Sequence, residues 1–260
     1  MIYVLHSSKT MQTVAGNHEL TQIPLFLRNA EELHTFLASL STSKLQDIMH
    51  VSENLAKSIH KQVHDWNTEP QTQTLAIDSF RGDIFSGLRA SSLSASERAY
   101  ANQHLIFLSG LYGLIRPFDS IMPYRLEMGY SLKGFKTTSL YEYWGTKIAD
   151  TVSDQTILNL SSVEYSKVLT KYIAKDKIYS PRFLSLDSKT NTYKNVAVHA
   201  KIARGAFARW AIQNRISDPK KLIEFKDLGY IYNKKLSSEH GPTFTCEIFQ
   251  GLGLSVRMQA

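Results

Sequence analysis

Residues 108–129, LSGLYGLIRPFDSIMPYRLEMG, contain side chains that could bind an anion and transfer a proton. Two prolines rule out a continuous helix through the segment, so we expect loop-like backbone, which commonly carries function. Arg116 or Arg125 would hold an anion. Asp119 or Glu127 would act as an acid or a base. Arg116 with Asp119, and Arg125 with Glu127, could instead form ordinary structural salt bridges, and that alternative stays open.

Three further residues belong to this candidate site. Tyr112 and Tyr124 have flat rings that would stack on a base, or that could simply pack in the interior. Lys9 follows the apolar segment MIYVLHS and would serve as a phosphate ligand or a nucleophile. The sequence therefore indicates a chemical site built from the 108–129 loop and the end of the first strand.

A second group of residues is basic and suits phosphate. The segment 198–216 carries four cations that could contact phosphate oxygens: Lys201, Arg204, Arg209 and Arg215. Gly205 would let a backbone or a phosphate approach closely. A solvated helix face is the ordinary explanation of such a charge run, and it remains an alternative.

The segment 45–59 has the apolar spacing of a helix-hairpin-helix DNA-binding element, which we expect over about 41–61. In such an element, hairpin N–H groups and a helix N-terminus bind a DNA phosphate. His50 and Ser52 replace the usual glycines, and Ser52 could still cap the second helix. Lys57 and Lys61, one turn apart, would reach phosphates. The alternative is two amphipathic helices with a turn.

The remaining chain supplies the scaffold. We predict a strand at residues 1–6, helices over 30–65, and a helix capped by Ser94 with Glu97. We also predict a hairpin over 178–193, a β-like segment at 195–203 that becomes helical after Gly205, and a last strand in TFTCEIFQ. The expected fold is one α/β (mixed α+β) domain over 1–260, with a central mixed sheet flanked by helices.

Composition excludes several classes of protein. No stretch approaches the roughly 20 apolar residues of a membrane helix. The single cysteine, Cys246, allows no internal disulfide, so we expect a cytoplasmic protein without a membrane partner. The net charge of +7 is compatible with a nucleic-acid partner and equally with a basic enzyme.

Metal and cofactor sites are not indicated. His60 and His64, with Asp65 adjacent, have a metal-binding spacing, but no H-E-x-x-H motif is present. Nucleotide-binding glycine loops and a G-x-S-x-G elbow are also absent. We expect no metal and no cofactor, and one cysteine with scattered histidines argues against direct iron sequestration.

The sequence resembles a known family. Six segments carry the resemblance in order along essentially the whole chain: VHDW (63–66), FRGDIFSGL (80–88), the 108–129 segment, LYEYWG (140–145), NLSSVEYSKVL (159–169) and HAKIARGAFARWAIQNRI (199–216). They are similar to the YaaA family of peroxide stress proteins, also called DUF328 or UPF0246. The resemblance implies a bacterial cytoplasmic protein linked to the hydrogen peroxide response and to limiting iron-dependent damage.

The resemblance also implies an unusual single-domain α/β fold, DNA binding, a helix-hairpin-helix element and a positively charged cleft. The sequence departs from the family pattern I-S-P-A-K-T at its first loop. There, HSSKT keeps Lys9 and Thr10 but has His6, Ser7 and Ser8. A pocket that uses this loop would have a different shape.

Two hypotheses follow. The first is a stress protein that binds DNA largely without regard to sequence, through Ser52, Lys57, Lys61 and the basic residues of 198–216. The alternative is an enzyme acting on a nucleobase, a nucleotide or damaged DNA at the 108–129 loop, so a nucleotide or base is a second candidate ligand.

Overall fold

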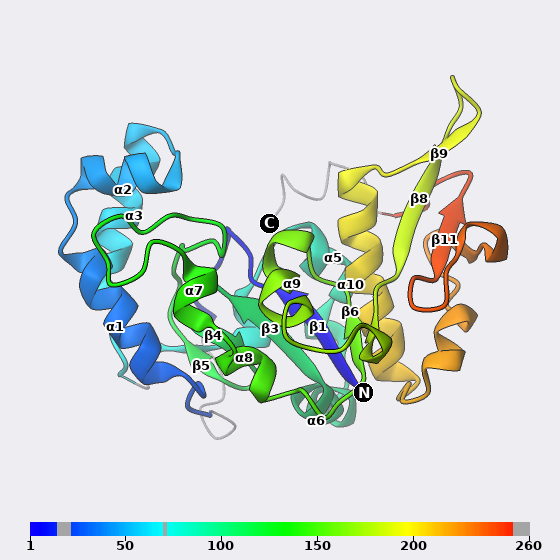
Figure 1. Ribbon diagram of the computed structural model, residues 1–260, viewed down its shortest axis with the longest axis horizontal. Helices are drawn as coiled ribbons and strands as arrows, with labels where there is room; N and C mark the ends of the chain where they lie inside the picture. Colours follow the sequence, from blue (N-terminus) through cyan, green and yellow to red (C-terminus); the bar gives the residue numbers. More distant parts are fainter. Residues whose placement is uncertain (15–21, 70–71, 252–260) are drawn as a thin grey trace.

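A five-stranded sheet in the order β4-β3-β1-β6-β7 lies at the centre of the molecule (Figure 1). The computed structural model describes residues 1–14, 22–69 and 72–251. The strands are β1 (Ile2–His6), β3 (Leu105–Ser109), β4 (Gly113–Ile115), β6 (Ile157–Asn159) and β7 (Ile178–Tyr179). The mixed α/β class predicted from the sequence is confirmed.

β1 is the central strand of this sheet. It pairs in parallel with β3 on one side and β6 on the other, and Val4 is opposite both Ile106 and Asn159. Tyr3, Val4 and Leu5 are fully buried, and every residue of β3 is buried, as expected for strands covered on both faces. Because the three strands run in parallel, their carboxyl ends meet at one edge.

A second sheet has four strands in the order β10-β11-β8-β9. They are β8 (Arg182–Asp187), β9 (Thr192–Lys194), β10 (Ile231–Tyr232) and β11 (Thr243–Cys246). The predicted hairpin is β8–β9, although it begins at Arg182, because β7 belongs to the central sheet. The predicted last strand is β11. A short pair joins β2 (Thr74–Leu75) to β5 (Ser120–Ile121).

Helices surround the two sheets. They are α1 (Leu27–Ala38), α2 (Thr42–Met49), α3 (Glu53–Asp65), α4 (Ala76–Ser79), α5 (Asp83–Leu88), α6 (Ala95–His104), α7 (Leu140–Trp144), α8 (Lys147–Asp150), α9 (Val163–Thr170) and α10 (Ala197–Gln213). Ser94 and Glu97 form the predicted capping box of α6. Among the described helices, none is long and apolar enough to span a membrane.

The β-like prediction for 195–203 is wrong. α10 begins at Ala197 and runs without interruption through Gly205. It contacts both β8 and β1, so one helix joins the two sheets (Figure 1). The alternating Val196, Val198 and Ile202 suggested a strand, but packing on several sides makes this segment helical, since tertiary contacts override weak propensity.

Gly205 is the place where α10 crosses α5. A Cβ added at Gly205 would lie 1.8 Å from the carbonyl oxygen of Ile84, and one added at Gly87 would lie 2.1 Å from that of Ile202. Gly205 therefore admits a neighbouring helix backbone, which is the first of the two approaches that the sequence predicted, and this backbone occupies the space that a phosphate would need.

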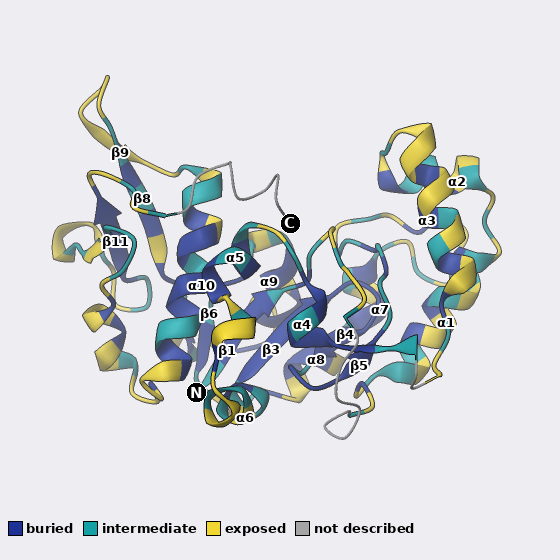
Figure 2. Ribbon diagram, turned by 180° about the vertical axis from the view of Figure 1, so that it is seen from behind, coloured by how far each residue is buried: buried dark blue, intermediate teal, exposed yellow. Residues whose placement is uncertain are grey.

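α2 and α3 form the predicted pair of helices, at one end of the molecule (Figure 2). His50, Val51 and Ser52 connect them, and His50 adopts the left-handed conformation with φ 50°. The Ser52 hydroxyl accepts a hydrogen bond from the Leu55 N–H at 3.4 Å, so the predicted cap is present.

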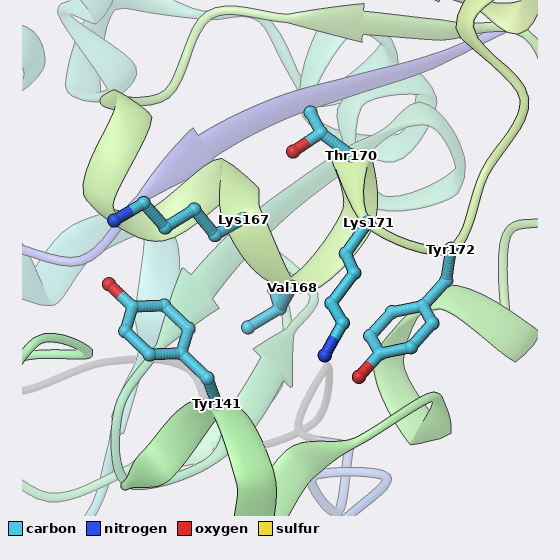
Figure 3. A pocket seen from close by; sticks show the side chains of 6 residues that line it. All are labelled: Tyr141, Lys167, Val168, Thr170, Lys171 and Tyr172. Atoms are coloured by element: carbon cyan, nitrogen blue, oxygen red, sulfur yellow. The ribbon is translucent and has the colours of Figure 1, made fainter.

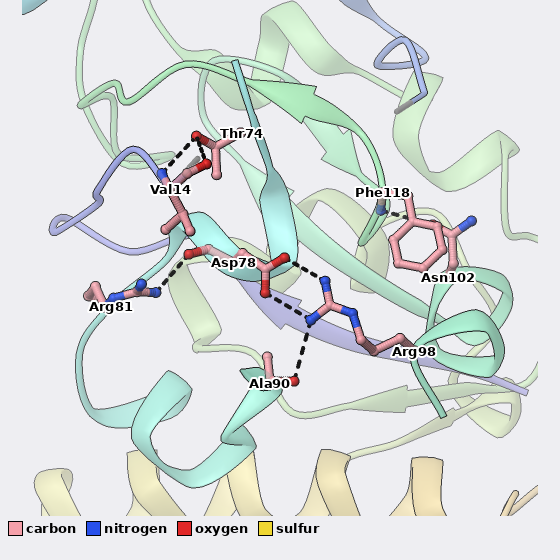
Figure 4. A network of polar contacts seen from close by, with 8 residues as sticks. All are labelled: Val14, Thr74, Asp78, Arg81, Ala90, Arg98, Asn102 and Phe118. Atoms are coloured by element: carbon pink, nitrogen blue, oxygen red, sulfur yellow. Dashed lines mark hydrogen bonds and ion pairs between the residues drawn. The ribbon is translucent and has the colours of Figure 1, made fainter. Parts of the chain in front are cut away.

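Polar contacts connect the 108–129 loop, α4 and α6 (Figure 4). Arg98 on α6 pairs with both carboxylate oxygens of Asp78 on α4. The Phe118 N–H donates to the Asn102 side-chain oxygen at 2.9 Å. These contacts fix α4, α6 and the loop relative to one another.

Candidate functional site

The carboxyl edge of β1, β3 and β6 gathers a set of polar side chains. The chain leaves β1 at Ser7, whose N–H donates to the Leu108 carbonyl at 2.8 Å. β3 ends at Ser109, and β6 is followed by Ser161 and Ser162 before α9. Ligand sites in open parallel sheets lie at this edge.

Buried hydroxyl groups form two contacts at this edge. The Ser109 and Tyr124 hydroxyl oxygens are 2.6 Å apart, and the Ser7 hydroxyl donates to the Tyr165 hydroxyl at 3.3 Å. Tyr165 lies on α9 and is 1% exposed. A proton can move along such linked hydroxyls, since each both donates and accepts.

Glu127 lies next to the Tyr165 hydroxyl, with which it forms a hydrogen bond. The backbone of the 108–129 loop folds back so closely that a Cβ on Gly110 would lie 2.2 Å from the Leu126 carbonyl oxygen. The Glu127 side chain is 12% exposed, and its carboxylate lies 3.7 Å from the Lys9 ammonium. Two candidates that are far apart in sequence therefore meet, as an acid–base site requires.

Burial raises the pKa of Glu127, and the Glu164 carboxylate raises it further. The charge of Lys9 and a hydrogen bond from Tyr165 act in the opposite direction, and burial is the larger influence. A carboxyl group with a raised pKa can hold a proton nearer to neutral pH and release it again. Glu127 is thus suited to general acid–base chemistry.

His6 lies on the other side of Tyr165. Its ring stacks on the Tyr165 ring with centroids 4.7 Å apart, and its Nδ1 accepts the Ser162 N–H at 3.2 Å. Burial lowers the pKa of His6 to about 3, and the charges of Arg204 and Lys201 lower it further. His6 is therefore neutral at neutral pH.

This low pKa predicts how stability depends on pH. As pH falls from about 6.5 towards about 3, His6 takes up a proton in the unfolded chain but not in the folded one, so unfolding is favoured. We expect His6→Phe to reduce the rise of stability with pH in this window by up to about 1.4 kcal/mol per pH unit. Urea unfolding of both proteins at several pH values measures it, and parallel curves would contradict it.

Arg204 and Lys201 reach the site from α10. Lys201 is exposed, whereas Arg204 is partly buried and burial lowers its pKa. Within the part of the chain that the structure describes, no hydrogen bond or ion pair holds the Arg204 guanidinium. A partly buried cation without a partner attracts an anion.

Arg209 and Arg215, the other two basic residues of this segment, lie in different surroundings. The Arg209 guanidinium donates to the carbonyl oxygens of Leu88 and Arg89 at the end of α5, at 3.3 and 3.0 Å. Arg215 lies over the Tyr100 ring at 5.6 Å. The four cations therefore do not share one face, and only Lys201 and Arg204 approach the strand edge.

The Arg116–Asp119 pair supports the loop. Asp119 is fully buried and accepts hydrogen bonds from the Arg116 N–H and Nε at 2.7 and 2.9 Å. Burial raises the pKa of Asp119, while Arg116 lowers it. With its oxygens occupied by Arg116, Asp119 has the structural role that the sequence left open. The Arg125 Nε is buried, and none of the described residues accepts a hydrogen bond from it.

The two tyrosines of the loop are interior residues. Tyr112 is 1% exposed and accepts a hydrogen bond from the Trp66 ring N–H at 2.9 Å. Tyr124 is 6% exposed and meets Tyr112 edge to face. Neither ring presents an open face, so the predicted stacking of a base would require this packing to move.

On α3, both candidate lysines have acidic neighbours. Lys57 pairs with Glu53 at 2.7 Å and Lys61 pairs with Asp65, and all four side chains are more than half exposed. His60 and His64 stack on each other at 4.2 Å. Among the described residues no group of three His, Cys, Asp or Glu could hold a metal ion.

An open hollow of about 220 Å³ lies beside α7 and the end of α9 (Figure 3). It is lined by Tyr141, Lys167, Val168, Thr170, Lys171 and Tyr172. Its lysines lie over the tyrosine rings, Lys167 over Tyr141 at 5.5 Å and Lys171 over Tyr172 at 5.3 Å. Lys9 and Glu127 do not line it, so it is separate from the strand-edge site.

Fold and site together define a mixed α/β protein with a Lys9–Glu127 ion pair at the edge of its parallel strands and, near it, a cation, Arg204, that no described residue pairs with. The family model of peroxide stress protein YaaA matches residues 1–236. The chain belongs to this family.

Relatives of this chain cover nearly its whole length. A UPF0246 protein of Salinispora tropica is 45% identical over 258 residues, which is 99% of this chain and 98% of that protein. UPF0246 proteins of Burkholderia multivorans and Ralstonia nicotianae are each 36% identical, over 252 and 249 residues, and cover 92% of this chain and 96% of their own.

Proposed function

We propose that this protein binds DNA during peroxide stress and limits iron-dependent oxidative damage to it. The observation that supports DNA binding is the α2–α3 pair, with its short connection, its left-handed His50 and its Ser52 cap. The Leu55 N–H is used by the Ser52 cap, but the N–H groups of Glu53 and Asn54 at the start of α3 lie at an exposed surface and suit a phosphate oxygen.

Electrostatics is compatible with this role. The exposed Lys57–Glu53 and Lys61–Asp65 pairs contribute roughly 0–1 kcal/mol each, so a phosphate can compete for the lysines. The net charge of +7 favours association with a polyanion. Such contacts go to the backbone of DNA, so binding should be largely independent of sequence.

A fluorescence-anisotropy titration of duplex DNA at several salt concentrations tests this proposal. We expect Lys57→Ala/Lys61→Ala to weaken binding and to reduce the slope of log K against log salt by about 1.8, or about 0.9 for each lost phosphate contact. Lys220→Ala/Lys221→Ala removes the same charge from another exposed site and is the control. A slope of zero in the wild type, or equal losses in both variants, would refute the proposal.

The Glu127–Lys9 pair favours a second function, an enzyme that acts on a nucleobase, a nucleotide or damaged DNA. A partly buried carboxyl group beside an ammonium group and linked hydroxyls provides an acid, a base and a charge at one place. Turnover of such a substrate that is lost in Lys9→Gln would support this function. No turnover across nucleotides, free bases and lesion-bearing duplexes would count against it.

A further inference from the structure

The Arg204 guanidinium has hydrogen-bond donors that no described protein group uses. The backbone that carries this side chain is packed closely on α5, because α10 crosses α5 at Gly205, the residue next to Arg204. Lys201 lies one turn earlier on the same helix and is exposed. The three-residue spacing places the two cations on the same face of α10, and the charges of both act on His6.

His6 adds a third donor. Since its Nδ1 accepts the Ser162 N–H, the neutral ring carries its proton on Nε2. Stacking on Tyr165 fixes the orientation of the ring. A neutral N–H donor next to two cations suits a phosphate group, which offers several acceptor oxygens and up to two negative charges.

Tyr165 connects this group to the acid–base pair. One face of its ring lies against His6, while its hydroxyl contacts Ser7 and hydrogen-bonds to Glu127. Only one aromatic side chain thus separates the cationic donors from Glu127 and Lys9. A ligand of modest size could contact both groups at once.

We propose that Arg204, Lys201 and His6 form a subsite for the terminal phosphate of a small phosphomonoester, such as a nucleoside 5′-monophosphate. This inference rests on the enzymatic function proposed above, and it places the reacting part of the substrate at Glu127 and Lys9. Because Arg204 and His6 are partly buried, a terminal phosphate reaches them, whereas a phosphodiester inside a duplex is flanked by sugars on both sides.

Isothermal titration calorimetry of the 260-residue chain with adenosine 5′-monophosphate, adenosine and inorganic phosphate tests the subsite. We expect the monophosphate to bind at least about tenfold more tightly than adenosine, because charge-assisted hydrogen bonds to the phosphate add affinity. Arg204→Gln should abolish this difference. His6→Phe, which keeps a ring against Tyr165, should reduce it about three- to tenfold.

Lys171→Gln, in the separate hollow of Figure 3, is the matched control and should bind the monophosphate as the wild type does. Equal affinity for monophosphate and adenosine, binding of neither, or a loss in Lys171→Gln instead of Arg204→Gln would overturn the subsite. Thermal unfolding shows whether Arg204→Gln is folded, and His6→Phe provides an independent result.

Glu127→Gln separates this inference from the proposed enzyme, because it should retain the preference for the monophosphate. Phosphate-dependent binding without turnover of any substrate would uphold the subsite and refute the enzymatic function. Turnover that needs Glu127 but shows no preference for a phosphorylated substrate would uphold the enzyme and refute the subsite.

Discussion

Gly205→Ala is expected to lower the free energy of unfolding by about 3 kcal/mol, although alanine favours helices by about 1 kcal/mol. The added methyl group would lie 1.8 Å from the Ile84 carbonyl oxygen, which belongs to the rigid backbone of α5. α10 and α5 would have to separate, and α10 also contacts both sheets. Urea unfolding measures the change.

Lys201→Ala is the control for this prediction, since it changes an exposed side chain on the same helix and should alter stability by less than about 0.5 kcal/mol. In Gly87→Ala, the added methyl group would clash with the backbone of α10 in the same way, so this variant should lose a similar free energy of unfolding to Gly205→Ala. An unchanged urea midpoint in both glycine variants would show that the two helices are not packed this closely.

Under the enzymatic function proposed above, Glu127→Gln is expected to abolish protection against hydrogen peroxide in bacteria that lack their own YaaA protein. General acid–base catalysis contributes about 10²- to 10⁴-fold to a rate, and glutamine cannot transfer a proton. Survival should fall to that of cells without the protein. Normal survival with Glu127→Gln, together with loss in Lys57→Ala/Lys61→Ala, would favour DNA binding over chemistry.

Glu127→Gln should not lower the stability of the folded protein. Because the folded-state pKa of Glu127 is raised, the folded protein binds the proton more tightly than the unfolded chain, and stability falls as pH rises through that pKa. Glutamine stays neutral, so Glu127→Gln should be at least as stable as the wild type at neutral pH. Glu53→Gln on exposed α3 is the matched control and should preserve survival.

Local signals predicted a good part of the fold. The apolar start of the chain is β1, the Ser94–Glu97 capping box opens α6, and the turn in DSKTN joins β8 to β9. Each depends on side chains close together in sequence. The order of the strands does not depend on such local signals, because β1 lies between two strands that come from distant parts of the chain.

The error at 195–203 has a physical cause. Alternating valines on a short segment are compatible with a half-buried strand, and no local residue excludes it. The structure places this segment against α5 and β8, where a helix with small residues at Ala203 and Gly205 packs closely. Only the tertiary partners decide between the two.

For the candidate site, residue types indicated Lys9 and Glu127, which the structure brings within 3.7 Å of each other, but gave no sign of the residues around them. Tyr165 stands out in the sequence only as part of the family-like segment NLSSVEYSKVL, and His6 only as a departure from the family pattern. The strand at 157–159 followed by Ser161 and Ser162 was the available signal, since strand ends commonly carry sites. That α10 brings Arg204 to the same edge depends on packing with α5.

The position of β1 between β3 and β6 has a consequence for biosynthesis. Ile2 pairs with Ile157, so its partner is made 155 residues later (157 − 2). At about 5–20 residues per second, the edge of β1 that pairs with β6 stays without its partner for about 8–30 s during synthesis, although β3, the partner on the other edge, is made earlier. During that time Tyr3, Val4 and Leu5 are a target for chaperones or for aggregation, and the strand-edge site cannot exist until β6 has emerged.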